Sequence, residues 1–156
     1  MTKIGLFPGS FDPFTLGHKC VVDEALKIFD KIIIAIGYNF SKKGFLEIDK
    51  RKQLIEDVYK NDNRVEVTIY SSLTIDEALR VGATSIIRSV RNVNDFEYEN
   101  NIAMINYNIC PDIQTVVLLT PPQVKHISSS LVRELYFFKH DIKNLLPEGI
   151  TLEKYF

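Results

Sequence analysis

The stretch KIGLFPGSFDPFTLGH, residues 3–18, predicts a strand followed by a glycine-rich turn and the start of a helix. The apolar run at 3–7 indicates a buried strand, and an amphipathic pattern over 17–29 indicates a helix that begins at the Gly17-His18 pair. A helix N-terminus carries unpaired N–H groups and about half a positive charge, and glycines such as Gly9 let an anion approach the backbone. This stretch therefore predicts a phosphate site beside His18.

The same alternation of strand and helix repeats along the chain. Further strands are predicted at 32–36, 65–70, 85–87 and 115–119, and further helices at 48–59, 75–81, 94–108 and from Ser128 onward, followed by one or two short helices. Continuous apolar runs are typical of parallel strands covered on both faces. We therefore expect a single α/β domain over residues 1–156, with a Rossmann-like, doubly wound, five-stranded parallel sheet and helices on both faces.

Composition restricts the kinds of partner. The 156 residues carry a net charge of −1, so no global basic field favours nucleic acid or an anionic membrane, and any anion site must be local. Cys20 and Cys110 lack metal-ligand spacing and lie in apolar helical patterns, which indicates reduced, packed thiols and a cytoplasmic protein. His126 and His140 show no zinc spacing, so no protein-bound metal is expected. No signal peptide or membrane-spanning segment is predicted.

Polar residues that follow the predicted strands are expected to converge, because ligands of such sheets lie beyond the carboxyl ends of the strands. They are Ser10 and His18 after the first strand, Lys42 after the second, Arg88 and Arg91 after the fourth, and Ser128, Ser129 and Ser130 after the fifth.

Each of these positions also has a plain structural interpretation. A lone histidine at a helix start is often a surface residue, but the neighbouring glycines favour an anion-binding role for His18. Arginines in loops are often solvated charges, but two guanidinium groups after a buried strand, Arg88 and Arg91, suit a polyphosphate. Lys42 and Lys43 either clamp a second anionic group or only increase solubility.

The remaining polar runs lie at the starts of predicted helices. Capping explains one of the three serines, and the others offer a second phosphate cradle. Asp95 and Glu97 fit ordinary acidic complements to a helix dipole, whereas the role of Glu99 stays open.

In order and spacing, these motifs resemble the bacterial phosphopantetheine adenylyltransferases, of the nucleotidyltransferase superfamily with a (Thr/His)-x-Gly-His signature. The resemblance spans residues 1 to about 135. Its motifs are PGSFDP (8–13), TLGH (15–18), SKK (41–43), IRSVR (87–91), DFEYE (95–99) and ISSS (127–130). The SKK and DFEYE motifs point to this family rather than to the wider superfamily.

The resemblance implies transfer of AMP from ATP to 4′-phosphopantetheine, giving dephospho-coenzyme A and pyrophosphate, with Mg²⁺ carried by ATP. It implies a homohexamer, and it implies catalytic roles for His18, Lys42 and Arg91. The acceptor would contact Ser10, Lys42, Arg88 and the backbone near Leu73 and Thr74. ATP would be surrounded by Ser10, Phe11, His18, Ser89, Val90, Arg91, Glu99, Val124, Lys125, His126, Ile127, Ser128, Ser129 and Ser130.

Three positions depart from the family pattern. Ser10 replaces a usual threonine, Ser89 a usual glycine, and Val124 a tryptophan of some members, so adenine recognition here would rest on shape and backbone groups. Two other functions share much of the pattern. One is a sibling adenylyl- or cytidylyltransferase acting on nicotinamide mononucleotide or an alcohol phosphate, and the other is a nucleotide sensor without turnover.

Overall fold

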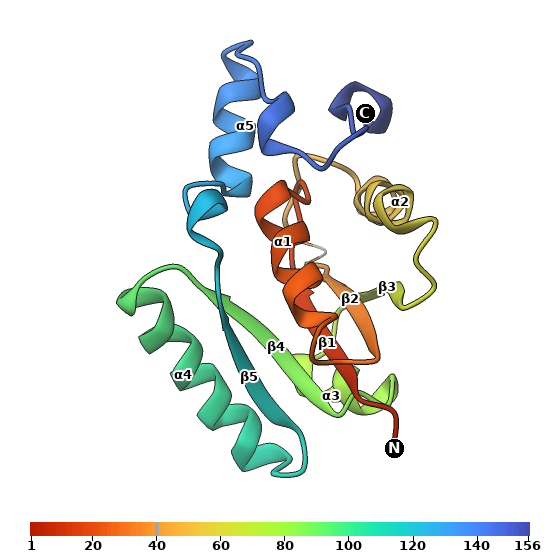
Figure 1. Ribbon diagram of the computed structural model, residues 1–156, viewed down its shortest axis with the longest axis vertical. Helices are drawn as coiled ribbons and strands as arrows, with labels where there is room; N and C mark the ends of the chain where they lie inside the picture. The colour runs from red at the N-terminus through yellow and green to blue at the C-terminus, as the bar shows by residue number, and fades with distance from the viewer. Residues whose placement is uncertain (40) are drawn as a thin grey trace.

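Five parallel strands form one sheet in the computed structural model, which describes residues 1–39 and 41–156 (Figure 1). The strand order is β3-β2-β1-β4-β5. The strands are β1 (Ile4–Gly9), β2 (Lys31–Gly37), β3 (Val65–Tyr70), β4 (Ser85–Val90) and β5 (Gln114–Leu119). The strand order reverses beside β1, so the switch point of this doubly wound sheet lies between β1 and β4.

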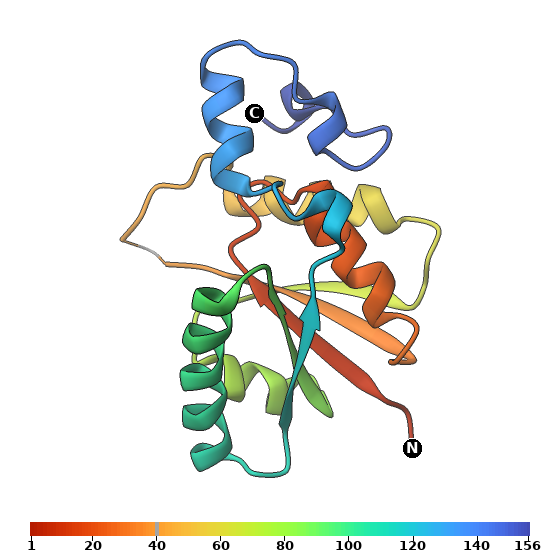
Figure 2. The same cartoon turned by 60° about the vertical axis from the view of Figure 1, so that its left-hand side comes forward.

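Helices cover both faces of the sheet, as the sequence predicts. They are α1 (Leu16–Ala25), α2 (Ile48–Tyr59), α3 (Thr74–Arg80), α4 (Val93–Ile109) and α5 (Ser129–Phe137), with short 3₁₀ turns η1 (Pro122–Val124), η2 (Lys143–Leu145) and η3 (Leu152–Tyr155). Figure 2 shows α3 and α4 on the side of the sheet opposite to α1. The carboxyl ends of the strands point towards α5, at the top of Figure 1.

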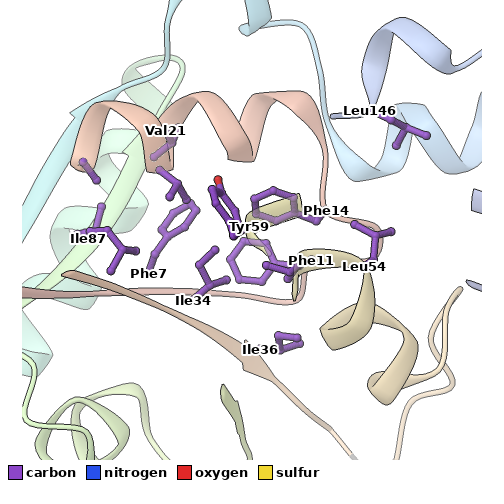
Figure 3. Close-up of a cluster of buried hydrophobic side chains, with 14 of the residues drawn as sticks. Phe7, Phe11, Phe14, Val21, Ile34, Ile36, Leu54, Tyr59, Ile87 and Leu146 are labelled. Carbon is purple, nitrogen blue, oxygen red and sulfur yellow. The ribbon is translucent and has the colours of Figure 1, made fainter. Parts of the chain in front are cut away.

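The larger apolar core lies between the sheet and α1, α2 and the C-terminal segment. Phe7, Ile34 and Ile87 come from the sheet, and Phe11 and Phe14 come from the turn that follows β1 (Figure 3). All five side chains are at most 4% exposed. Phe11 and Phe14 therefore make the turn after β1 part of the core. Their packing fixes the backbone of this turn in one position.

The two central strands separate as they approach their carboxyl ends. β1 and β4 pair only through Gly5 with Ser85 and Leu6 with Ile86, whereas β1 and β2 stay paired as far as Gly9. Pro8 has no backbone N–H, so it donates no hydrogen bond to either neighbour. A gap between strands therefore opens at the switch point.

Most element boundaries differ from the sequence prediction by at most two residues, and the ends of β4 and α1 differ by more. β4 continues through Arg88 to Val90 because it stays paired with β5 over these residues, so Arg88 lies in the strand and not after it. α1 ends at Ala25, and the chain reaches Phe29 through turns, although the Phe29 side chain still packs in the core. Cys110 caps α4 instead of lying within it. Within the described parts of the chain, no helix is long and apolar enough to cross a membrane.

Candidate active site

A cleft of about 430 Å³ lies where β1 and β4 separate. It brings together the turn after β1, the start of α1, the end of β4, the first turns of α4 and the start of α5. Its polar lining includes Ser10, His18, Arg88, Ser89, Arg91, Glu99, Ser128 and Ser129, and Phe11 and Ile127 also line it. These residues, predicted from distant parts of the sequence, are therefore neighbours in the fold.

His18 is held by the residue that caps its own helix. Thr15 is the N-cap of α1, and its backbone N–H donates to Nδ1 of His18 at 3.0 Å, while the His18 backbone N–H donates to the Thr15 hydroxyl at 3.4 Å. The imidazole stacks on Phe14, with ring centroids 5.4 Å apart, and meets Phe11 edge to face. Since Nδ1 accepts a hydrogen bond, a neutral ring carries its proton on Nε2.

Burial lowers the pKa of His18 from 6.5 to about 4, and the nearby Arg91 guanidinium adds to the lowering. The imidazole is therefore neutral at pH 7. The neutral ring offers the cleft a hydrogen-bond donor at Nε2 and adds no charge to it.

The lowered pKa of His18 makes the fold sensitive to acid. The unfolded chain takes up a proton near pH 6.5 and the folded chain only near pH 4, so the free energy of unfolding falls as the pH drops through this window. At pH 5 the expected loss is about 2 kcal/mol. Urea unfolding at pH 7 and pH 5 should show this extra loss in the native protein relative to His18→Gln. Equal losses in the two proteins would contradict a neutral His18.

The two glycines near His18, Gly9 and Gly17, differ in how tightly they are packed. A Cβ on Gly9 would lie 2.8 Å from the Phe11 ring, and Phe11 itself has a φ of +46°, which its buried ring holds in place. A Cβ on Gly17 would lie 3.4 Å from the Ile127 carbonyl oxygen. This is an ordinary van der Waals distance, so packing alone does not require glycine at position 17.

Arg88 crosses the gap between the central strands. Its Nε and Nη2 donate to the two carboxylate oxygens of Glu99 at 2.5 and 2.6 Å, and Nη1 donates to the Pro8 carbonyl oxygen at 3.1 Å. Glu99 is 7% exposed, so the ion pair is largely removed from solvent. The pair fixes the plane of the guanidinium at the base of the cleft.

Arg91 and Asp95 form a second pair at the mouth of the cleft. The Asp95 carboxylate accepts the Arg91 backbone N–H at 3.1 Å and its Nε at 3.3 Å, and the Asn92 side chain caps α4 by accepting from the Asp95 backbone N–H. The acidic first turn of α4 thus holds Arg91, which goes beyond the dipole complement that the sequence predicts for Asp95. Glu97 is exposed and lies beyond the first turn of α4.

The three serines divide their tasks. Ser128 is the N-cap of α5 and accepts the Leu131 backbone N–H at 3.1 Å. Ser129 donates to the Pro13 carbonyl oxygen at 2.8 Å, which ties α5 to the turn after β1. Ser130 accepts a hydrogen bond from Arg133 and does not line the cleft. Of the three serines, Ser128 and Ser129 line the cleft at the start of α5.

Several residues that the sequence predicts for the site lie outside this cleft. They are Lys42, Thr74, Val90, Val124, Lys125, His126 and Ser130. Thr74 begins α3, and its hydroxyl lies 3.0 Å from that of Tyr70, on the far side of β2 from the cleft. Lys42 is exposed in the loop after β2. Val90 and Val124 are buried, whereas Lys125 and His126 are exposed.

A larger hollow of about 1190 Å³ lies between α5 and the C-terminal segment. Its lining is mainly apolar and includes Phe45, Tyr136 and Leu146. Its described lining contains no arginine, whereas the smaller cleft holds Arg88 and Arg91, which suit a polyphosphate. We therefore place the chemistry in the smaller cleft.

Over residues 1–39 and 41–156, no group of three or more histidine, cysteine or acidic side chains is arranged to hold a metal ion. The two acidic side chains of the cleft that pair with arginines, Asp95 and Glu99, already have cationic partners.

Comparison with known proteins identifies the family. A family model described as cytidylyltransferase-like matches residues 6–135. A phosphopantetheine adenylyltransferase from Bacteroides thetaiotaomicron is 46% identical over 147 residues, which cover 94% of this chain and 97% of that protein. The enzyme of the same name from Cytophaga hutchinsonii is 44% identical over 150 residues, which cover 96% of this chain and all of that protein.

The chain belongs to the phosphopantetheine adenylyltransferase family.

More distant structures share the fold of this phosphopantetheine adenylyltransferase family member. A bifunctional NMN adenylyltransferase/ADP ribose pyrophosphatase from Francisella tularensis superposes with a TM-score of 0.76 at 17% identity, over 97% of this chain and 47% of that one. A putative nicotinate-nucleotide adenylyltransferase from Vibrio parahaemolyticus gives a TM-score of 0.66 at 21% identity, with 94% of each chain covered. At these identities the similarity shows the fold alone.

The sequence places Thr15 beside His18 without a role of its own and leaves Arg133 as either a helper of the site or an exposed residue, yet both shape the site of this family member. Thr15 fixes the ring of His18, and Arg133 donates to the Asp12 carbonyl oxygen at 2.7 Å, so that α5 is tied to the turn after β1. The Thr15-x-x-His18 spacing matches a capping box and could have revealed the role of Thr15. Arg133 bonds over 121 residues of sequence, which no local pattern encodes.

Proposed function

We propose that this protein performs the reaction of its family, the transfer of the adenylyl group of ATP to 4′-phosphopantetheine, which gives dephospho-coenzyme A and pyrophosphate. The neutral His18 carries this proposal, held by Thr15 at the start of α1 and facing two arginines across one cleft. Such a site neutralises negative charge on the oxygens of a reacting phosphate. It suits a direct transfer, in which the protein supplies no nucleophile.

The reaction consists of one displacement. A phosphate oxygen of phosphopantetheine attacks the α-phosphorus of ATP, a new P–O bond forms in line, and the bond from the α-phosphorus to the bridging oxygen breaks, so that pyrophosphate leaves. Positioning and charge neutralisation then carry the catalysis. His18 donates through Nε2 to the α-phosphate, where negative charge grows.

The other residues hold the two substrates in place. Ser10, Arg88 and Lys42 bind the acceptor phosphate, Arg91 binds the phosphates of ATP, and Ser128 with Ser129 presents the start of α5 to the same chain of phosphates. ATP enters as its magnesium complex, and the ion reduces the charge of the phosphates. The Ser89 side chain, in place of a backbone approach at glycine, lines the cleft beside ATP.

Pyrophosphate release tests the function directly. The native protein is incubated with ATP and Mg²⁺ together with either 4′-phosphopantetheine or nicotinamide mononucleotide, and both pairs are repeated with CTP. Release only with ATP and phosphopantetheine supports the proposal. Release with the other acceptor would assign a sibling transferase, and ATP binding without release from any pair would assign a sensor.

Self-association belongs to the same proposal, and we infer a cytoplasmic homohexamer. α4 buries Glu99 and Asn106, while its apolar side chains Phe96, Met104 and Ile105 are about half exposed. Exposed apolar side chains gathered along one helix favour an interaction surface. Light scattering should give a mass six times the 17.9 kDa of the chain. A monomer would contradict the hexamer.

A further inference from the structure

We infer that the buried Asp12–Arg51 pair positions the loop that carries Lys42, and that it thereby sets the affinity for the acceptor phosphate more than the affinity for ATP. This inference rests on the proposed function. Asp12 belongs to the turn after β1, and Arg51 lies in the first turns of α2. Neither residue lines the cleft.

The Asp12 carboxylate holds the loop after β2 by its backbone. Oδ2 accepts the Phe45 N–H at 2.7 Å and Oδ1 accepts the Leu46 N–H at 2.8 Å. A carboxylate that accepts two backbone N–H groups fixes both residues of the loop in orientation as well as in distance.

Arg51 completes the connection from the other side. Its Nε donates to the Leu46 carbonyl oxygen at 2.8 Å, Nη1 donates to the Ser10 carbonyl oxygen at 3.3 Å, and Nη2 lies 3.2 Å from Oδ2 of Asp12. The Arg51 and Asp12 side chains are only 8% and 12% exposed. One guanidinium therefore joins the start of α2, the loop and the backbone of a residue that lines the cleft.

Gly44 gives the pair its space. A Cβ on this residue would lie 1.6 Å from Nη2 of Arg51 and 2.9 Å from Oδ2 of Asp12. Any side chain at this position would displace the guanidinium. The loop backbone therefore passes directly against the ion pair, beside the residues that lead back to Lys42.

Lys42 depends on these contacts for its position. In the described part of the chain, its ammonium group makes no hydrogen bond or ion pair, and its backbone N–H donates to the Asn39 carbonyl oxygen at 3.1 Å. Lys43 and Gly44 alone separate it from Phe45, the first residue that Asp12 holds. Releasing Phe45 and Leu46 would let Lys42 move by several ångströms, because each residue spans about 3.8 Å.

A buried ion pair is weak evidence for stability, because desolvation offsets its attraction. This pair, however, directs most of its hydrogen bonds to backbone atoms of two loops that flank the acceptor phosphate. Its main effect is therefore to keep the loop in its binding position, so that less ordering is needed when the acceptor arrives.

Kinetics of three variants test this inference. Arg51→Met removes the charge, Asp12→Asn places an amide N–H against a backbone donor, and Gly44→Ala displaces the guanidinium with a single methyl group. Each should raise KM for phosphopantetheine about tenfold and KM for ATP less than about threefold. Asp57→Asn is the matched control on α2, because it loosens the contact to Lys154 and Tyr155 and leaves both KM values unchanged.

A double-mutant cycle separates positioning from general loosening. In a Lys42→Ala background, Arg51→Met and Gly44→Ala should change KM for phosphopantetheine by less than about twofold, because the residue that they position is already gone. If their full effects persist in that background, or if KM for ATP rises as much as KM for the acceptor, the inference is wrong. Gly44→Ala keeps the test valid if the charged-pair variants do not fold.

Amide hydrogen exchange provides a readout that does not depend on turnover. In folded Gly44→Ala, the Phe45 and Leu46 N–H groups should exchange faster than in the native protein, while those of α4 stay unchanged. Unchanged exchange at Phe45 and Leu46 would overturn the inference. If the native protein shows no turnover with phosphopantetheine, the proposed function fails, whereas this exchange result still decides whether the pair holds the loop.

Discussion

Alanine in place of His18 is expected to lower kcat by about 10²–10³-fold while changing both KM values much less. In the proposed reaction the Nε2 donor meets the α-phosphate as negative charge develops there, so its loss should act on the transition state more than on the bound substrates. Steady-state pyrophosphate release with saturating ATP and phosphopantetheine measures the effect. A kcat within about threefold of the native value would remove His18 from the chemistry.

His18→Gln is the informative companion to the alanine variant. A glutamine side chain offers an amide N–H near the position of Nε2, and it cannot reproduce the Nδ1 contact with Thr15. We expect it to recover part of the lost kcat, because a donor remains, though one that is less well oriented. Equal kcat values in the two variants would mean that the ring contributes packing and not a hydrogen bond.

Phe14→Ala should lower the free energy of unfolding by about 3–5 kcal/mol, the largest loss of stability that we expect. The Phe14 side chain is fully buried, and its ring contacts Phe11, Tyr59 and the imidazole of His18. Truncation leaves a cavity between α1, α2 and the turn after β1 (Figure 3). Urea unfolding at pH 7 measures the difference.

Phe14→Leu is the matched control, because it keeps most of the volume and removes the ring on which His18 stacks. It should lose about 1 kcal/mol of stability and still show a reduced kcat, since the imidazole loses one of the surfaces that orient it. If Phe14→Ala lowers the free energy of unfolding in urea by less than about 1 kcal/mol, the turn repacks around the cavity.

The fold could be predicted from the sequence because its signals are local. Apolar runs such as 32–36 reveal buried parallel strands, and Ser128 marks a helix start through its capping side chain. The end of β4 was missed at Arg88, since a charged residue ends an apolar run although pairing with β5 continues. Strand pairing depends on the tertiary structure, and the hydrophobic periodicity of the sequence does not reveal it.

The cleft was predictable only in part, for the same reason. His18, Arg91 and Ser128 were identified because each follows a strand or begins a helix. The contacts that hold Arg88 and the turn after β1 could not be recognised in the sequence, because Glu99 reaches back from α4 to Arg88 and Arg51 reaches from α2 to the Ser10 carbonyl oxygen. Ion pairs between elements depend on the packing of helices onto the sheet, which follows from the whole sequence.

The separation of β1 from β4 restricts how this scaffold can change its acceptor. Beyond Leu6, where β1 no longer pairs with β4, the Arg88 side chain donates the hydrogen bond that the Pro8 carbonyl oxygen accepts. A residue that is proposed to bind the acceptor therefore also connects the two central strands. Substitution there alters architecture and recognition together. New acceptors are therefore more readily accommodated by exchange of the loop after β2 or the start of α3, which lie at the rim and can vary while the centre stays intact.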